Sequence, residues 1–105
     1  MPYEIYRNPR ASGDIRQFVR YLRREAGAAI ARVYLGALEH DLEVVIGNNP
    51  NTFGWFHETG EPYRAKLFRV GRTFFWIIYV VDDERRRVEI IRLWNAVRQP
   101  LAHGL

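Results

Sequence analysis

Basic side chains are the residues in this sequence whose type and spacing could do chemistry. Every basic residue except Lys66 is arginine, and the formal net charge is +4. Arg64 and Lys66 stand two positions apart in a run typical of a strand, so both side chains are expected to project from one face of a sheet, about 7 Å apart. Two cations at that separation suit a run of phosphates better than a single carboxylate. The sequence therefore predicts an anionic partner, either nucleic acid or an acidic protein.

A cationic sheet face could cleave RNA without a metal ion. The cations would hold the scissile phosphate and stabilise the negative charge that builds up as the 2′-oxygen attacks. A general base and a general acid would still be required, and arginine is a poor choice for both because it does not readily lose its proton. Lys66, Tyr79 and His103 are the candidates for proton transfer. The alternative is a face that is merely solvated or that binds a protein.

A second group of basic residues recurs at helical spacing near the N-terminus. Its members are Arg16, Arg20, Arg23 and Arg24. Ile15, Phe18 and Leu22 form the apolar face of the same predicted helix, so the arginines are expected on another face. Such a stripe is most often a solvated helix face. The sharper hypothesis is a surface that binds an acidic segment of a partner protein.

Composition excludes several other chemistries. The chain has no cysteine, which removes disulfides, thiolate metal sites and cysteine nucleophiles. No glycine-rich phosphate loop is present, and His40, His57 and His103 lack metal-ligand spacing, so we expect neither a metal nor a cofactor. We also expect no signal peptide and no membrane partner, because no apolar run approaches the roughly 20 residues that span a bilayer. The expected location is the reducing cytoplasm.

The segments that position these side chains predict one α+β domain over residues 1–105. A short strand is expected at 3–6, followed by a helix capped by Ser12. Gly27 ends this helix, and a second apolar stripe predicts another helix over 28–46. That stripe comprises Ile30, Val33, Tyr34, Ala37, Leu38, Leu42 and Val45. Two amphipathic helices joined at a glycine form an αα-hairpin.

Three consecutive strands are predicted in the second half of the chain. They cover 64–70, 73–81 and 86–94, separated by turns at Gly71-Arg72 and at 82–85. The middle strand is almost wholly β-branched or aromatic, so it is expected to be central and buried on both faces. Short loops imply an antiparallel meander, and the helical hairpin is expected to cover one of its faces.

The order and spacing of three segments resemble the RelE/ParE toxin superfamily. The segments are 62–72, 75–82 and 88–98, and with the preceding strand and helical hairpin the resemblance covers nearly the whole chain. It implies the toxin of a type II toxin–antitoxin pair, the class that includes plasmid stabilisation systems. Such toxins are neutralised by a small cognate antitoxin whose tail wraps around them.

Two branches of that superfamily imply different activities. The RelE-like branch cleaves mRNA on the ribosome, and the ParE-like branch is associated with inhibition of DNA gyrase. Carried over from the first branch, Arg64, Lys66 and Arg98 match basic positions of that branch. Its C-terminal tyrosine is absent here, and His103 could substitute for it chemically. Trp76 replaces an arginine of that branch. The leading interpretation is therefore a toxin with a ParE-like or divergent mechanism, and the alternatives are a metal-independent mRNA endoribonuclease and a non-catalytic binding module.

Overall fold

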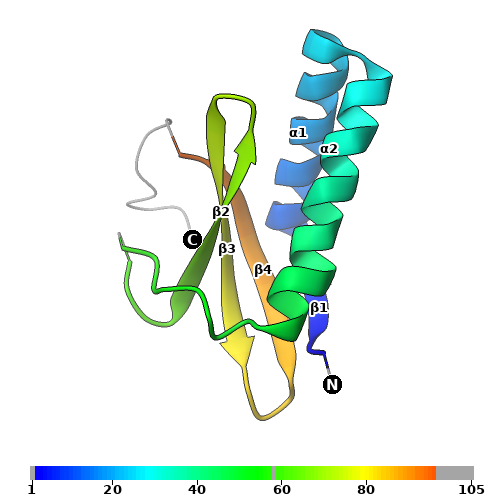
Figure 1. The fold of residues 1–105 in the computed structure, drawn as a ribbon. Helices are drawn as coiled ribbons and strands as arrows, with labels where there is room; N and C mark the ends of the chain where they lie inside the picture. The colour runs from blue at the N-terminus through cyan, green and yellow to red at the C-terminus, as the bar shows by residue number, and fades with distance from the viewer. Residues whose placement is uncertain (1, 58, 97–105) are drawn as a thin grey trace.

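A helical hairpin lies against one face of a twisted sheet in this computed structural model, which describes residues 2–57 and 59–96 (Figure 1). The element order confirms the predicted α+β fold: one strand, two helices and a three-stranded meander. No helix in the described part is long and apolar enough to cross a membrane. The elements are β1 (Glu4–Arg7), α1 (Pro9–Ala26), α2 (Ala28–His40), the π-helical segment η1 (Asp41–Ile46), β2 (Tyr63–Val70), β3 (Thr73–Asp82) and β4 (Arg87–Asn95).

The sheet has the strand order β1-β4-β3-β2. The pairs β2–β3 and β3–β4 are antiparallel, as short connections require. The strand β1 joins the other side of β4 in parallel, from Glu4 opposite Arg87 to Arg7 opposite Ile90. Parallel neighbours need a long crossover, which the rest of the chain supplies. The meander strand β3 is therefore internal, and its centre, Ile77–Tyr79, is fully buried.

The main core lies between the helices and the sheet, as predicted. The helical side contributes Ala11, Ile15, Phe18, Leu22, Ala31, Leu38, Leu42 and Ile46. The sheet contributes Phe68, Ile77, Tyr79, Val88, Ile90 and Leu93. Phe18 packs edge-on against Phe75 and Phe68, with ring centroids 5.1 and 6.1 Å apart, a favoured aromatic geometry.

The first helix starts earlier than predicted. Its N-cap is Asn8, not Ser12, and the Asn8 side chain accepts a hydrogen bond from the Ala11 amide at 2.8 Å. Pro9 then fits the first helical position because its missing N–H has no partner there in any helix. Gly27 ends the helix as predicted, with a φ of 92° that glycine adopts without strain.

The second helix buries only part of the predicted stripe: Leu38 and Leu42 are buried as predicted, but the start of the stripe is not. Ile30 and Val33 are 43% and 66% exposed, whereas Ala31 and Leu38 are buried. Apolar residues occur on more than one side of this alanine-rich helix, so periodicity alone does not select the buried side. The helix also changes at Asp41 into the wider η1, which alters the angular spacing of Leu42 and Ile46.

The other face of the sheet carries a smaller apolar cluster. Phe56, from the connector between η1 and β2, is buried against Ile78. Around them pack Tyr63, Ala65, Trp76, Ile91 and Trp94. A bulge in β4 opposite Ile78 and Tyr79 places Ile91 in this cluster while Leu93 reaches the main core. The connector therefore covers part of the sheet face that lies opposite the helices.

Candidate functional site

Arg64 and Lys66 project from the same face of β2, as strand alternation predicts, and this is the face that the helices cover. Lys66 Nζ lies 2.8 Å from Asp41 Oδ2 of η1, and both side chains are only 17% exposed. Arg64 donates a hydrogen bond to the carbonyl oxygen of Phe53, and its guanidinium lies 3.8 Å from the centre of a Trp55 ring. Both cations thus fasten neighbouring segments to β2. Their catalytic role stays a prediction.

Of the remaining predicted catalytic residues, the structure describes only Tyr79. Tyr79 is fully buried and donates a hydrogen bond from its hydroxyl to the carbonyl oxygen of Pro50 at 2.7 Å. Burial raises its pKa far above the usual range, so the phenol keeps its proton. Arg98 and His103 lie outside the described residues. Within the described ranges no three His, Cys, Asp or Glu side chains lie together as a metal site requires.

The arginine stripe of α1 is exposed, as predicted, and it borders two grooves. We call Arg16, Arg20, Arg23 and Arg24 the arginine face. Arg20 and Arg24 line a groove of about 540 Å³ between α1 and the end of β4, the α1–β4 groove. Arg16, Arg20 and Arg23 line a groove of about 430 Å³ between the two helices, the α1–α2 groove. Arg20 stands on the ridge between the two.

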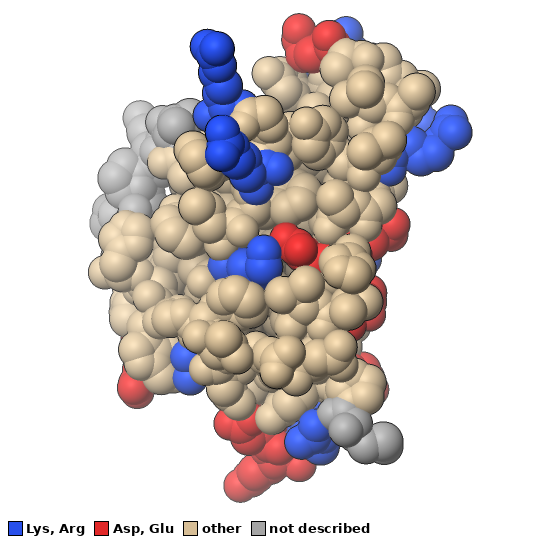
Figure 2. All heavy atoms as spheres, in the orientation of Figure 1, with Lys and Arg blue, Asp and Glu red and all other residues tan. Residues whose placement is uncertain are grey.

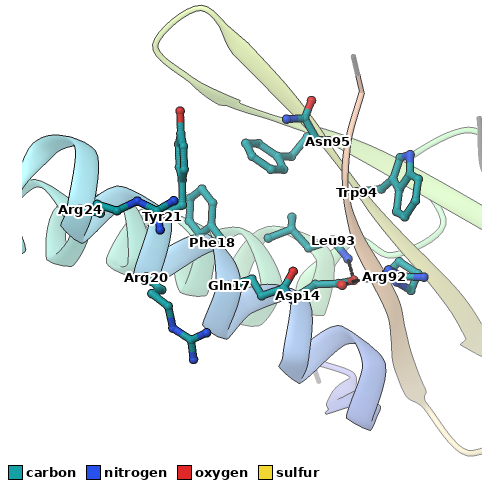
Figure 3. Close-up of a pocket in the computed structure, with 11 residues that line it drawn as sticks. Asp14, Gln17, Phe18, Arg20, Tyr21, Arg24, Arg92, Leu93, Trp94 and Asn95 are labelled. Carbon is teal, nitrogen blue, oxygen red and sulfur yellow. Dashed lines mark hydrogen bonds and ion pairs between the residues drawn. The ribbon is translucent and has the colours of Figure 1, made fainter. Parts of the chain in front are cut away.

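The α1–β4 groove combines an apolar floor with a basic wall (Figure 3). Phe18 of α1, Phe75 of β3 and Leu93 of β4 lie at its base. Arg20 and Arg24 extend from α1 along one side, and Arg20 has no ion-pair partner among the described residues. Such a groove suits a ligand that carries apolar groups and negative charge together.

The one carboxylate in the α1–β4 groove is fully engaged. Asp14 accepts hydrogen bonds from Arg92 Nε at 2.7 Å, from Arg92 Nη2 at 3.0 Å and from the Leu93 amide at 3.1 Å. The two side chains are 15% and 13% exposed. Because this pair is neutral as a whole, the charge that the groove presents comes from Arg20 and from Arg24, whose Nε lies 3.6 Å from Oε1 of the exposed Glu25.

The pairing of Asp14 with Arg92 was not predicted from the sequence. Asp14 precedes the buried Phe18 by four residues, so it lies on the core side of α1. A carboxylate at such a position signals a buried partner, because an unpaired charge there would be costly. The identity of the partner, Arg92, depends on how α1 packs on β4, which no local pattern gives.

The α1–α2 groove repeats the same combination on the other side of the helix. Ile15, Val19 and Leu35 provide apolar surface. Its acidic residue, Glu39, lies 3.7 Å from Arg7, which also lines the groove and lies 3.8 Å from Glu43. Arg16 and Arg23 have no acidic partner in the described part of the chain. The groove is therefore basic along its α1 side.

Comparison with known proteins gives matches at the level of structure. The sequence matches no protein-family model and no curated protein. The structure is similar to a chain of a chromosomal ParDE toxin–antitoxin system from P. aeruginosa, with a TM-score of 0.63 and 16% identity over 89% of this chain and 95% of that one. It is also similar to a chain of the RelBE2 toxin–antitoxin complex from Mycobacterium tuberculosis, with a TM-score of 0.59 and 18% identity over 93% of this chain and 95% of that one.

Both matches cover nearly all of each chain, so the likeness concerns the complete arrangement of strand, helical hairpin and meander. This confirms the fold that the sequence resemblance implied. The chain has the RelE/ParE-like fold.

Proposed function

We propose that this chain is the toxin of a type II toxin–antitoxin system and that an acidic segment of its antitoxin binds along the arginine face of α1. The observation that carries the proposal is the pair of grooves on either side of this one helix. Each has apolar surface and shares Arg20, which has no ion-pair partner among the described residues. Both similar structures come from toxin–antitoxin systems, which favours a protein as the occupant.

The chemistry of the grooves defines the antitoxin segment. Its apolar side chains would cover Val19 and Leu35 in one groove and Phe75 in the other. Its carboxylates would meet the guanidinium groups at the rims, where arginine forms two parallel hydrogen bonds with a carboxylate. An amphipathic acidic segment satisfies both requirements, and a purely acidic chain satisfies only the second.

We further propose that growth inhibition follows a ParE-like or divergent mechanism, with DNA gyrase as the candidate target in the cytoplasm. Lys66 is held by Asp41, Arg64 is held by the connector, and the Tyr79 hydroxyl is buried. A phosphate would have to compete with these contacts for both cations. This favours inhibition by binding over cleavage of mRNA.

Induction of the chain in a bacterial host, alone and with the product of its adjoining reading frame, tests the toxin role. We expect the chain alone to stop growth, with DNA replication arrested and transcripts intact, and we expect co-expression to restore growth. Translation-dependent mRNA cleavage that is lost in Arg64→Ala/Lys66→Ala would instead establish the ribonuclease alternative. Harmless strong induction would remove the toxin proposal.

Charge reversal in the same assay tests the arginine face. Arg16→Glu/Arg20→Glu/Arg23→Glu is expected to stay toxic but to lose rescue, with antitoxin affinity reduced at least about 100-fold because like charges would face each other. Arg32→Glu is the matched control, since Arg32 is an exposed arginine of α2 that lines neither groove. Equal affinity for both variants would show that the arginine face is merely solvated.

A further inference from the structure

The strand β2 forms one edge of the sheet, and the connector pairs with only part of that edge. The Phe56 amide donates to the Tyr63 carbonyl at 2.7 Å, and the Ala65 amide donates to the Gly54 carbonyl at 3.1 Å. Trp55 and Arg64 form the antiparallel bridge between these two bonds. Because hydrogen-bonding directions alternate along a strand, Tyr63 and Ala65 point their backbone groups outward, and Leu67 and Arg69 do the same.

Beyond Ala65 this edge is open. Phe53, the residue before Gly54, packs against the main core, so the connector leaves the edge there. The amides of Leu67 and Arg69 have no acceptor among the described residues, and the Leu67 carbonyl accepts only from Lys66 Nζ, at 3.2 Å. The Leu67 side chain is 42% exposed. Two consecutive outward-facing residues thus offer their donors and acceptors to a further strand.

We propose that a short extended acidic segment of the partner protein pairs with Leu67–Arg69 as an additional strand, continuing the ladder that the connector begins. The inference rests on the proposed function, because the segment is taken to belong to the antitoxin. It assigns a second contact, separate from the arginine face. Backbone bonds from Leu67 and Arg69 would supply much of the affinity, as in other cases of strand addition.

The positive charge of the β2–β3 hairpin favours an acidic segment as the added strand. The β2–β3 hairpin contains no acidic residue before Asp82, whereas Arg69 and Arg72 are both basic and exposed. Figure 2 shows basic side chains standing out over the end of this hairpin. Arg69 donates a hydrogen bond to the Gly71 carbonyl at 2.8 Å and lies 5.5 Å from the Phe74 ring centre, so its side chain folds back along the hairpin. The charge stays near the edge while the backbone remains accessible.

The same charges argue against a second copy of this chain as the occupant. Antiparallel pairing of two β2 edges in the register that centres on Arg69 would place Arg69 of the two copies opposite each other and Arg72 opposite Lys66, and like charges across a strand pair are destabilising. Basic residues on an edge strand block such self-association. An acidic strand turns the same residues into favourable contacts.

Hydrogen exchange of the chain, free and bound to the antitoxin that rescues growth, tests the inference. We expect the Leu67 and Arg69 amides to exchange quickly in the free chain and at least about tenfold more slowly in the complex. The Ala65 amide is the internal control, because Gly54 already accepts its hydrogen bond and it should be protected in both states. Unprotected Leu67 and Arg69 amides in a complex that neutralises the toxin would overturn the strand addition and leave the proposed function intact.

Proline substitution gives a second measurement. Proline is tolerated on an edge strand where the lost N–H faces outward, so Leu67→Pro and Arg69→Pro should each weaken antitoxin binding about tenfold through loss of a backbone bond. Leu67→Ala keeps the amide and should bind within about threefold of the unmodified chain. Equal weakening by Leu67→Ala and Leu67→Pro would assign the effect to the side chain and contradict the backbone pairing. A chain that no adjoining protein neutralises would overturn the proposed function and this inference with it.

Discussion

At the scale of single residues, Asp14 connects the first helix to the last strand. Its carboxylate accepts three hydrogen bonds, two from Arg92 and one from the Leu93 backbone. The bonds close one end of the α1–β4 groove and fix where Arg20 and Arg24 stand relative to β4. One carboxylate therefore sets both the packing of α1 and the shape of the surface that we assign to the antitoxin.

Removal of this carboxylate is expected to destabilise the protein markedly. Asp14→Ala removes the acceptor of two hydrogen bonds from the Arg92 guanidinium, which is largely shielded from water, and this should cost about 2–3 kcal/mol of unfolding free energy. Urea denaturation followed by circular dichroism gives the value. Glu84→Ala serves as the control, because Glu84 is exposed in the β3–β4 turn and should change stability by less than about 0.5 kcal/mol. A similar small effect for both variants would show that the pair adds nothing to stability.

The acidic β3–β4 turn makes a pH-dependent contribution. Hydrogen bonds to Asp83 from Tyr3 and then from Asn51 lower the pKa of this carboxyl below its usual range. A group whose pKa is lower in the folded state stabilises the fold above its unfolded-state pKa, and this contribution is lost as the pH falls through the folded-state pKa. Tyr3→Phe removes the first donor, so the Asp83 pKa should rise towards its ordinary value. An NMR titration of the Asp83 carboxyl measures this pKa. An unchanged value would show that the hydrogen bond from Tyr3 does not influence it.

At the scale of elements, the two helices meet at a residue that only glycine suits well. Gly27 has a φ of 92° and serves as both the end of α1 and the start of α2. A methyl group at Gly27 would meet no atom within 4 Å, and the same holds at Gly36 inside α2. The two positions therefore differ in backbone conformation and not in available space.

Replacement of each of these two glycines by alanine is expected to change the unfolding free energy in opposite directions. Gly27→Ala should lower the unfolding free energy by about 1 kcal/mol, because a side chain at this φ is strained. Gly36→Ala should raise it by about 0.5–1 kcal/mol, because alanine is the better helix former. Thermal unfolding of the two variants checks both signs. Destabilisation by both would mean that Gly36 makes a close contact that the structure does not contain.

Local sequence patterns were sufficient to predict the helices and strands. How these elements pack against one another could be learned only from the structure. Strand alternation and the turn at Gly71 located the meander, and Gly27 located the break between the helices. The partner of β1 could not be predicted, because a four-residue strand with no adjacent turn contains nothing that selects β4. For the candidate site, helical spacing predicted the exposed arginine face. It did not predict the grooves, because residues such as Phe75 and Leu93 come from distant segments.

At the scale of the whole molecule, basic side chains outnumber acidic ones on two surfaces, the arginine face and the β2–β3 hairpin. The formal net charge is +4, and the acidic residues nearest the proposed contacts are engaged by basic ones: Asp14 by Arg92 and Asp41 by Lys66. An acidic antitoxin would therefore be attracted over a distance comparable to the Debye length before any contact forms. Charge is thus expected to act mainly on the association rate.

The salt dependence of binding tests this expectation. The association rate constant of chain and antitoxin should fall about tenfold or more between 50 and 500 mM NaCl, with a much smaller change in the dissociation rate constant. Stopped-flow fluorescence, for example of Trp55, which is 47% exposed, follows the reaction. An association rate that does not depend on salt would show that the arginines act only after contact.

The parallel pairing of β1 with β4 also constrains when the protein is able to fold. The first strand to leave the ribosome has as its neighbour the last strand of the sheet, so the nascent chain must be made through Asn95 before the sheet is complete. Pairing between such distant segments also slows folding after synthesis. A newly made chain would therefore pass through an interval in which its complete folded surface does not yet exist, and a partner already present in the cell could capture it before that surface forms.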